Sequence, residues 1–436
     1  PEPDPEPDPA PDPAPDDAVP GVAVTGRTVS FSGGLRLLVT GTDLADTIVV
    51  GQTSGGLVLS GSATAAFDGS FQSVVIYGFG GDDTIRLANS VTGASVIYAG
   101  AGSDDVFDAG LGAGELHGGD GDDLLISIGG GSDTVWGDAG DDSFWVDSSD
   151  SISDASSAET AAKKVHRVSE FYQPWTSNSG SADYVSLEIT GQDMKDPTLT
   201  SSAYHYSDFS SRPLFNGITY DDSTQGYIGD CYFLAALSSM AVTDPGVIAE
   251  SITALGDGTY AVRFYQGSQE VYLRIDGELP VRSGGSLIYA GLGEGGDIWM
   301  PLMEKAYAHF RYGSNSYSSI EGGWMGTVYA QITGRGYVNR SVYSATADAT
   351  FQWIQGRFDG GHAVTAGTWL GGGPIIGSHA YVVTSLETVE GQDFVTVFNP
   401  WGVDGRSYDS NYSDGLLKLT SAQFSQYFYR LQSSVA

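Results

Sequence analysis

The sequence predicts a multidomain protein with an all-β N-terminal half and a C-terminal half of the α+β class. Short β-branched runs alternate with Gly, Ser and Thr from residue 22 to about residue 75, without helical periodicity. Segments of nine residues rich in Gly and Asp then recur between residues 78 and 145, as in stacked β-solenoids. Further on, an apolar helical run (232–241) is followed by apolar β-runs, among them 379–386 and 392–400.

The composition limits the size and the partners of the protein. Its 436 residues suffice for two or three domains. Of its 54 acidic residues 40 are Asp, and together with 61 Gly this favours turns and oxygen-ligand metal sites over helices. The net charge of −35 argues against nucleic acid and anionic membranes as partners. No apolar run reaches the ~18 residues of a membrane span, and we expect a monomer.

The chain has one cysteine, Cys231, which excludes an intrachain disulfide and a multi-cysteine zinc site. Residues 1–20 alternate Pro with Asp and Glu and predict an extended, disordered linker. The sequence starts at Pro1 without a signal-peptide pattern, and we expect that an upstream segment has been removed.

The nine-residue segments are 78–86, 99–107, 118–126, 128–136 and 137–145, with a degenerate copy at 41–49. Each has Gly near its start, an acid at its sixth position and an apolar residue at its eighth. Gly permits sharp turns and exposes carbonyl groups, and a carboxylate completes an oxygen shell suited to Ca²⁺. The sixth residues are Asp83, Asp104, Asp123, Asp133 and Asp142, the eighth are Ile85, Val106, Leu125, Val135 and Phe144, and the preceding acids Asp82, Asp122 and Asp141 are further candidate ligands.

In these features residues 78–145 resemble the hemolysin-type (RTX) calcium-binding repeats. The resemblance implies a parallel β-roll with several Ca²⁺ ions between its turns, within a β-rich region 21–147. It favours a secreted, extracellular or cell-surface location, where calcium would fold the roll. A metal-free solenoid is the alternative, which we weigh lower because stacked carboxylates without cations repel one another.

Residues 148–205 form a predicted connecting segment with one helix within 156–171, capped by Ser156 or Ser157. The helix could pack on a neighbouring domain or belong to a prosegment. We favour packing, because nothing in the sequence marks a cleavage site.

The stretch 225–241 has the features of a nucleophile site. A Gly-rich turn, GYIGD, delivers Asp230 and then Cys231 to the start of an apolar helix, with Asp230 a candidate cap. The helix dipole lowers the pKa of a thiol at this position and favours the thiolate. Gln225, six residues upstream, could donate a hydrogen bond to an oxyanion.

A thiol nucleophile needs a base, and the base needs an orienting partner. His379 opens the β-run 379–386, and the next predicted strand, 392–400, ends in Asn399 and Pro400. If these runs pair as a hairpin through the loop 387–391, Asn399 reaches His379 and holds its ring in one tautomer.

Each of these residues has a simpler interpretation. A lone Cys is usually a small buried hydrophobe, and Trp401 could be part of a core. His362 also follows Gly and opens a β-run, but we expect it to pack on a strand. We expect His309 on a helix face and Glu304 and Lys305 as a solvated or structural pair.

The blocks QGYIGDCYFLAAL, PLMEKAYAHF, GSHAYVV and FNPWG resemble the calpain family of papain-like cysteine proteases, over about residues 208–430. For residues 206–436 the resemblance implies an α+β core of two lobes. It implies Cys231 as nucleophile, His379 as base and acid, Asn399 as orienting residue, Gln225 as oxyanion donor and Trp401 as a shield over the His–Asn pair. Asp222 matches one acid of a calcium site in the family core, whereas Ser318 stands where a second acid is expected.

The resemblance implies a calcium-associated cysteine endopeptidase acting on proteins and peptides. The alternative is a calcium-dependent adhesion or surface protein with an inactive protease-like domain. Self-cleavage within 148–205 is a further hypothesis.

Overall fold

The computed structural model describes residues 23–174, 183–405 and 411–435, and the predicted linker 1–20 lies outside them. The chain forms two compact units. The solenoid unit comprises the residues up to 169 together with 187–190, and the C-terminal unit comprises 170–186 and 191–436. No helix within the described ranges has the length and hydropathy needed to cross a membrane.

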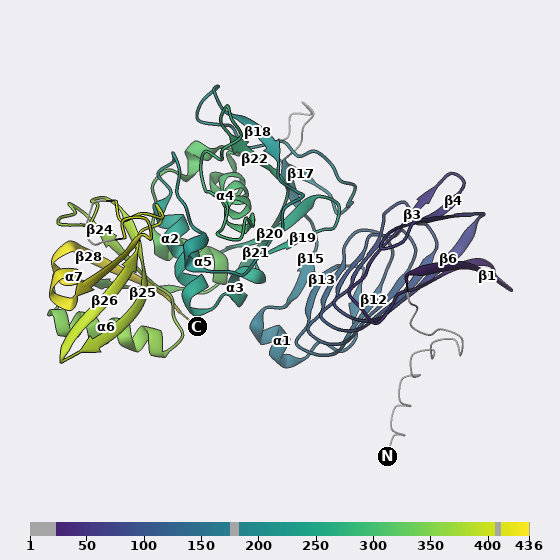
Figure 1. Ribbon diagram of the computed structural model, residues 1–436, viewed down its shortest axis with the longest axis horizontal. Coiled ribbons are helices and arrows are strands. Elements are labelled where there is room, and N and C mark those ends of the chain that lie inside the picture. Colours follow the sequence, from purple (N-terminus) through teal and green to yellow (C-terminus); the bar gives the residue numbers. More distant parts are fainter. Residues whose placement is uncertain (1–22, 175–182, 406–410, 436) are drawn as a thin grey trace, which may run out of the picture. The chain divides into compact units, whose positions relative to one another are not determined.

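The solenoid unit is built from strands that alternate between two sheets (Figure 1). From β6 onward each strand pairs in parallel with the strand two places further along the chain, so that five turns stack. The first sheet holds β1 (Thr25–Phe31), β2 (Gly34–Thr40), β6 (Phe71–Gly80), β8 (Ala94–Ala101), β10 (Gly114–Asp120), β12 (Thr134–Ala139) and β14 (Ser151–Ile152). The second holds β3 (Thr47–Thr53), β4 (Gly56–Gly61), β5 (Ala65–Asp68), β7 (Thr84–Leu87), β9 (Asp105–Asp108), β11 (Leu124–Ser127), β13 (Ser143–Asp147) and β15 (Val165–Val168).

A thin apolar core lies within the solenoid and draws side chains from both sheets. All five residues at the predicted eighth positions of the repeats belong to it, and none of them is exposed to solvent. Successive side chains of a strand point to opposite faces of its sheet, so every second residue of each turn points into this core. The structure therefore confirms the predicted solenoid and its inward-facing residues.

The helix predicted within 156–171 is shorter than expected. It is α1 (Ser157–Ala162), which Ser156 caps in a capping box with Glu159. The helix ends at Lys163, which adopts a left-handed conformation (φ 67°), and the chain then forms β15, parallel to β13. The β-branched residues of VHRV favour the open sheet edge over a longer helix.

The C-terminal unit combines helices with three sheets (Figure 1). Its helices are α2 (Cys231–Thr243), α3 (Gly246–Ala249), α4 (Trp299–Phe310), α5 (Met325–Thr333), α6 (Ala347–Asp359) and α7 (Ser421–Tyr427), with 3₁₀ turns η1 (Tyr220–Asp222), η2 (Arg311–Gly313) and η3 (Tyr317–Ile320). Two sheets use β16 (Tyr172–Pro174), β17 (Asp183–Val185), β18 (His205–Asp208), β19 (Ile252–Ala254), β20 (Thr259–Gln266), β21 (Gln269–Asp276) and β22 (Glu278–Val281). The third has the order β23 (Tyr337–Ser341), β28 (Phe428–Ser434), β24 (Val364–Thr368), β25 (Ala380–Val389), β26 (Gln392–Phe398) and β27 (Leu416–Thr420).

Two apolar cores organise this unit. The larger surrounds α2, α4 and α5 together with the strands β20–β22. The other lies between the third sheet and the helices α6 and α7. The mixed α+β class is thus observed, while the papain-like arrangement of two lobes stays a prediction.

The predicted connecting segment 148–205 is divided between the two units. Residues 148–169 complete the solenoid, whereas residues 191–205 are built into the C-terminal unit. There Thr198 N–H donates to the Asn315 carbonyl (2.9 Å) and Tyr317 N–H donates to the Thr198 carbonyl (3.1 Å). The C-terminal unit therefore extends upstream of the predicted boundary at residue 206.

Candidate active site

Cys231 is the first residue of a buried helix, as predicted. Asp230 occupies the N-cap position of α2, and its carbonyl accepts hydrogen bonds from the N–H groups of Phe233 and Leu234 (2.7 and 3.2 Å). The Asp230 side chain makes no capping hydrogen bond. The thiol is half-buried at the end of the helix where unsatisfied N–H groups favour negative charge.

His379 and Asn399 are brought together by the predicted hairpin. β25 and β26 pair antiparallel, with Val382 opposite Phe398. This register places the residue before β25 beside the residue after β26, and His379 Nε2 lies 2.8 Å from Asn399 Oδ1. An amide oxygen only accepts hydrogen bonds, so Nε2 carries the ring proton and Nδ1 keeps a lone pair.

Several contacts fix this pair. Asn399 Nδ2 donates to the Val403 carbonyl (2.8 Å), and the Trp401 N–H donates to Asn399 Oδ1 (3.1 Å). The Trp401 ring lies 4.9 Å from the His379 ring, centroid to centroid. The His379 N–H donates to Thr368 Oγ1 (3.0 Å). The imidazole is therefore held from both its backbone and its ring.

Burial governs the protonation of both groups. It raises the pKa of the Cys231 thiol to about 11, although the Ala380 N–H acts in the opposite direction. It lowers the pKa of His379 to about 4, although the hydrogen bond that the ring donates to Asn399 acts in the opposite direction. The expected dipole-lowered thiol pKa is therefore not observed in this arrangement. Burial disfavours a Cys231 thiolate alone and a His379 imidazolium alone. The two ions are therefore favoured only when they form together as a pair.

A cavity of about 790 Å³ contains the candidate residues. Its lining includes Cys231, His379, Trp401 and Gln225, together with several aromatic side chains. A thiol, an imidazole and a cavity large enough for a peptide side chain thus coincide within the C-terminal unit.

Gln225 lines the cavity, but its amide is engaged elsewhere. Its Nε2 donates to the Ile228 carbonyl (2.6 Å) and to Asp230 Oδ1 (3.1 Å), which uses both donors of the group. An oxyanion role for Gln225 therefore requires its side chain to rotate.

Two buried carboxyl groups behind Cys231 were not predicted as partners. Asp230 is not exposed and Glu304 is 1% exposed. Burial raises the pKa of Asp230 to about 6 and raises the pKa of Glu304 well above its usual range, where the charge of Asp230 adds to the effect. We infer that the two carboxyls retain one proton. Glu304 is thus no solvated partner of Lys305, which contacts different acids.

The rival histidines lie elsewhere. His362 precedes β24 and does not line the cavity. His309 is buried near the end of α4, on a helix as expected.

Comparisons with known proteins identify the family of the C-terminal half of the chain. A family model described as calpain family cysteine protease matches residues 205–423, which is half of the chain. The chain belongs to the calpain family of cysteine proteases. Similar proteins include the calpain-type cysteine proteases ADL1 of rice (29% identical over 211 residues) and DEK1 of maize (28% over 206 residues), and the human calpain-2 catalytic subunit (27% over 213 residues).

These matches cover 43–44% of the chain. The chain spans 9% of the length of each plant protein and 29% of the human subunit. The similarity thus concerns the calpain-family domain alone.

In the calpain-family domain, Asp222 is buried in η1 and accepts three hydrogen bonds. The donors are the Thr219 N–H (2.9 Å), Trp299 Nε1 (3.0 Å) and the Glu294 N–H (3.3 Å). Ser318, where a second acid was expected, lies exposed in η3. The carboxylate of Asp222 is therefore satisfied by N–H donors without a metal.

Four predicted ligands of the solenoid form a ladder along one edge. The Oδ1 atoms of Asp83, Asp104, Asp123 and Asp142 each accept the N–H of the acid one turn earlier, at 2.7–2.9 Å, and Asp46 of the degenerate copy starts the series. Glu159 of α1 ends it by accepting the Asp142 N–H (3.0 Å).

The second carboxylate oxygens of this ladder are suited to a cation. Oδ2 of Asp83, Asp104 and Asp123 is buried without a hydrogen-bond partner. A Cβ added at Gly78, Gly118 or Gly137 would lie 2.2–2.4 Å from Oδ2 of Asp83, Asp123 or Asp142, so glycine lets these three carboxylates approach the backbone. Burial raises the pKa of Asp83 and of Asp123 to about 7. An oxygen-seeking ion such as Ca²⁺ fits this donor set.

Asp133 does not belong to this ladder. Its repeat turns from β11 into β12, whereas the other four copies turn from the first sheet into the second. Asp133 Oδ1 accepts the Gly114 N–H (2.5 Å), and its own N–H donates to Asp150 (3.0 Å) on the opposite edge. The remaining candidates are exposed: Asp82, Asp122 and Asp141.

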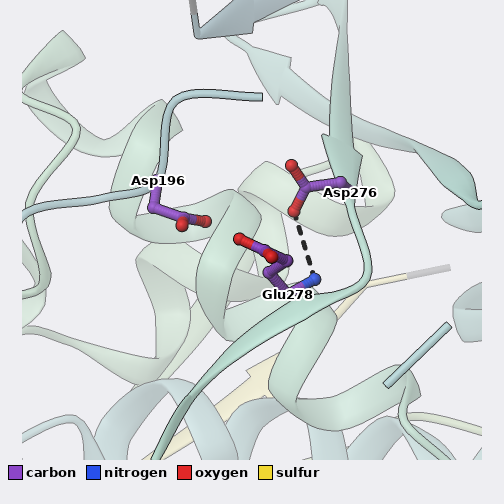
Figure 2. A group of neighbouring side chains, drawn as sticks. All are labelled: Asp196, Asp276 and Glu278. Atoms are coloured by element: carbon purple, nitrogen blue, oxygen red, sulfur yellow. Dashed lines mark hydrogen bonds between the residues drawn. The ribbon is translucent and has the colours of Figure 1, made fainter. Parts of the chain in front are cut away.

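Among the described residues, one group of three acids brings its oxygens within 4.8 Å of one another. Asp196, Asp276 and Glu278 converge in the C-terminal unit (Figure 2). Lys305 Nζ lies 2.6 Å from both Asp196 Oδ1 and Asp276 Oδ1, and it donates to the Glu278 carbonyl (2.7 Å). Because a buried ammonium already pairs with two of these three carboxylates, we assign no metal to the group.

Proposed function

We propose that the protein is a calcium-associated cysteine endopeptidase that uses Cys231, His379 and Asn399. One observation carries the proposal: His379, hydrogen-bonded to Asn399, lines the same cavity as Cys231. Proteins and peptides are the proposed substrates.

In the proposed mechanism, His379 Nδ1 takes the proton of the Cys231 thiol as the sulfur attacks a peptide carbonyl carbon. The S–C bond forms while the carbonyl π electrons move to oxygen. The imidazolium then protonates the leaving amine as the C–N bond breaks, which leaves a thioester. Water, deprotonated by the same imidazole, hydrolyses the thioester and restores the thiol.

The Cys231 N–H at the start of α2 is the proposed first oxyanion donor. Gln225 is the proposed second donor, after its amide leaves Ile228 and Asp230. Such a donor typically contributes about 10²–10³ in rate. Trp401 covers the His–Asn pair, and by excluding water it strengthens their hydrogen bond.

We further propose that the acid ladder Asp83–Asp142 holds Ca²⁺ and that the ion would neutralise the carboxylates and let the solenoid fold. An extracellular location, where weak calcium sites are filled, accords with this proposal. The RTX assignment rests on the repeat pattern, which the buried, unpartnered Oδ2 atoms support.

A thiol-directed peptidyl probe tests the function directly. We expect stoichiometric labelling of Cys231 in the calcium-loaded protein, with labelling and casein hydrolysis both lost in Cys231→Ala. In His379→Ala labelling should become slow, whereas His362→Ala should behave as wild type. A folded protein that neither labels nor cleaves would favour the adhesion or surface-protein alternative.

A further inference from the structure

The walls of the active-site cavity contrast in charge with the rest of the chain. The chain has 54 acidic residues and a net charge of −35. No Asp or Glu is found among the described residues that line the cavity, and Arg430 on β28 is its one charged side chain apart from the titratable Cys231 and His379. An acidic group entering the cavity therefore meets a cation and no carboxylate among the described lining residues.

Aromatic side chains hold the Arg430 guanidinium. Its carbon lies 4.6 Å from the centroid of the Trp324 ring and 5.5 Å from that of the Tyr429 ring. Trp324 is 47% exposed and Trp369, which meets Tyr429 edge to face at 6.2 Å, is 64% exposed. These rings offer apolar surface beside the cation.

The hydrogen-bonding capacity of Arg430 is available. Among residues 23–174, 183–405 and 411–435, no carboxylate lies within 4.0 Å of its guanidinium. A guanidinium that lies against a ring keeps its N–H groups in its own plane, directed away from that ring. This is the geometry in which arginine binds a carboxylate through two parallel hydrogen bonds.

We propose that Arg430 is a specificity-determining residue that binds a carboxylate of the peptide substrate, with Trp324 and Trp369 packing against apolar side chains next to it. This inference rests on the proposed peptidase function. The preferred substrates are peptides with Asp or Glu near an aromatic or large aliphatic residue close to the scissile bond.

The experiment uses the full chain with calcium and blocked peptides that differ at one position at a time. Each set carries Glu, Gln or Lys at that position, with the N-terminus acetylated and the C-terminus amidated. At one position we expect kcat/KM to be about 10- to 100-fold higher for Glu than for Gln, mainly through KM, since charge-assisted hydrogen bonds have this strength. A neutral peptide with a free C-terminus separates a side-chain carboxylate from a chain end: a preference confined to the free C-terminus would overturn the side-chain assignment.

Variants of Arg430 decide the assignment. Arg430→Gln should abolish the preference for Glu, Arg430→Lys should keep part of it, and Arg430→Glu should reverse it toward Lys peptides. Arg335→Gln, which removes an exposed charge elsewhere, should leave the preference unchanged. The reversal cannot come from a fold defect, because a fold defect would not create a new preference.

Equal cleavage of Glu and Gln peptides by the wild type, or a preference that survives Arg430→Gln, overturns the inference while peptidase function stands. Absence of hydrolysis of every peptide together with an unlabelled Cys231 overturns the proposed function itself, and the inference with it.

Discussion

At the scale of single residues, the His379–Asn399 hydrogen bond sets which ring nitrogen can act as a base. We expect Asn399→Ala to lower kcat/KM by about 10²–10⁴, the usual contribution of general acid–base catalysis, because the imidazole loses its fixed tautomer and orientation. Peptide hydrolysis under calcium saturation measures the effect. Asn216→Ala, an exposed amide outside the cavity, is the matched control, and an Asn399→Ala enzyme as active as this control would contradict the positioning role.

The buried imidazole should also titrate at an unusual pH. Burial lowers the pKa of His379 to about 4, below the ordinary value of 6.5. The unfolded chain thus binds more protons between these values, and this contribution to the unfolding free energy is complete above pH 6.5 and is lost as the pH falls through 4. NMR titration of ¹⁵N-histidine-labelled protein, with His379→Ala to assign the signal, should give a midpoint near 4. A midpoint near 6.5 would mean that water reaches the ring.

The sequence could predict Cys231, His379 and Asn399 because each stands at the end of a strongly patterned element. It could not predict the engagement of Gln225 or the Asp230–Glu304 pair. The Asp230–Glu304 pair joins the start of α2 to α4, and a local pattern says nothing about which buried carboxyl another helix will meet. Adjacent Glu304 and Lys305 read as a pair, yet neighbours on a helix do not face each other.

At the scale of elements, the sequence predicted the nine-residue repeats, but it did not predict on which edge of the solenoid each repeat places its acid. Five copies share one pattern, and four of them place their sixth residue on one edge of the solenoid. Asp133 lies on the other edge, because its copy follows the preceding one after a single strand. The helix α1 is short for a similar reason: the β-branched VHRV run that looked helical in context pairs with β13.

We expect the acid ladder to make the unfolding free energy of the solenoid fall as the pH rises without calcium, and increase when calcium is added. The pKa of Asp123 is raised from 3.8 to about 7, so without calcium the folded solenoid binds more protons than the unfolded chain between these values. Its unfolding free energy should fall as the pH rises from about 4 to 7. Calcium, which binds the ionised form, should stabilise the solenoid more at pH 7.5 than at pH 5.

The substitution Asp123→Asn separates the effect of carboxylate ionisation on the stability of the solenoid from the effect of calcium binding. The amide oxygen can still accept the Asp104 N–H but cannot ionise. At pH 7.5 we expect the variant to resist hydrogen exchange in residues 73–168 better than the wild type in chelator, and less well in calcium. Asp68→Asn, which removes an exposed carboxylate of β5 outside the repeats, is the matched control. If chelator and calcium give the wild type identical exchange, the ladder binds no calcium.

Lys305 ties three segments of the calpain-family domain together. Its ammonium contacts Asp196 before β18 and Asp276 at the end of β21, while it projects from α4. Lys305→Met leaves these acids without a cation, and we expect the unfolding free energy to fall by about 3–5 kcal/mol. Urea unfolding measures it. Adding Asp276→Asn should restore part of the loss, whereas Lys418→Met, at a half-exposed ion pair with Glu387, should change the unfolding free energy by less than about 1 kcal/mol.

At the scale of the whole molecule, the two units pose the question of where calcium acts. In the solenoid unit, buried carboxylate oxygens lack partners. In the calpain-family domain, Asp222 is satisfied by three N–H donors, and Ser318 replaces the second acid expected there. The boundary of the C-terminal unit also bears on this question, because residues 170–174 and 191–205 belong to that unit.

A chain of residues 170–436 should therefore hydrolyse peptides without calcium, at a rate close to that of the calcium-loaded full chain. Asp222 keeps its N–H partners in this chain, and the Lys305 contacts remain intact. A chain of residues 206–436 should be less stable and less active, since it lacks Asp196 and the strand β16. The measurement is peptide hydrolysis in chelator, in calcium and in magnesium, with Cys231→Ala as the inert control. Strict calcium dependence of the 170–436 chain would place a working calcium site in the calpain-family domain, at Asp222, despite its N–H partners. Activity independent of calcium would assign the ion to the solenoid, where it would govern folding and not chemistry.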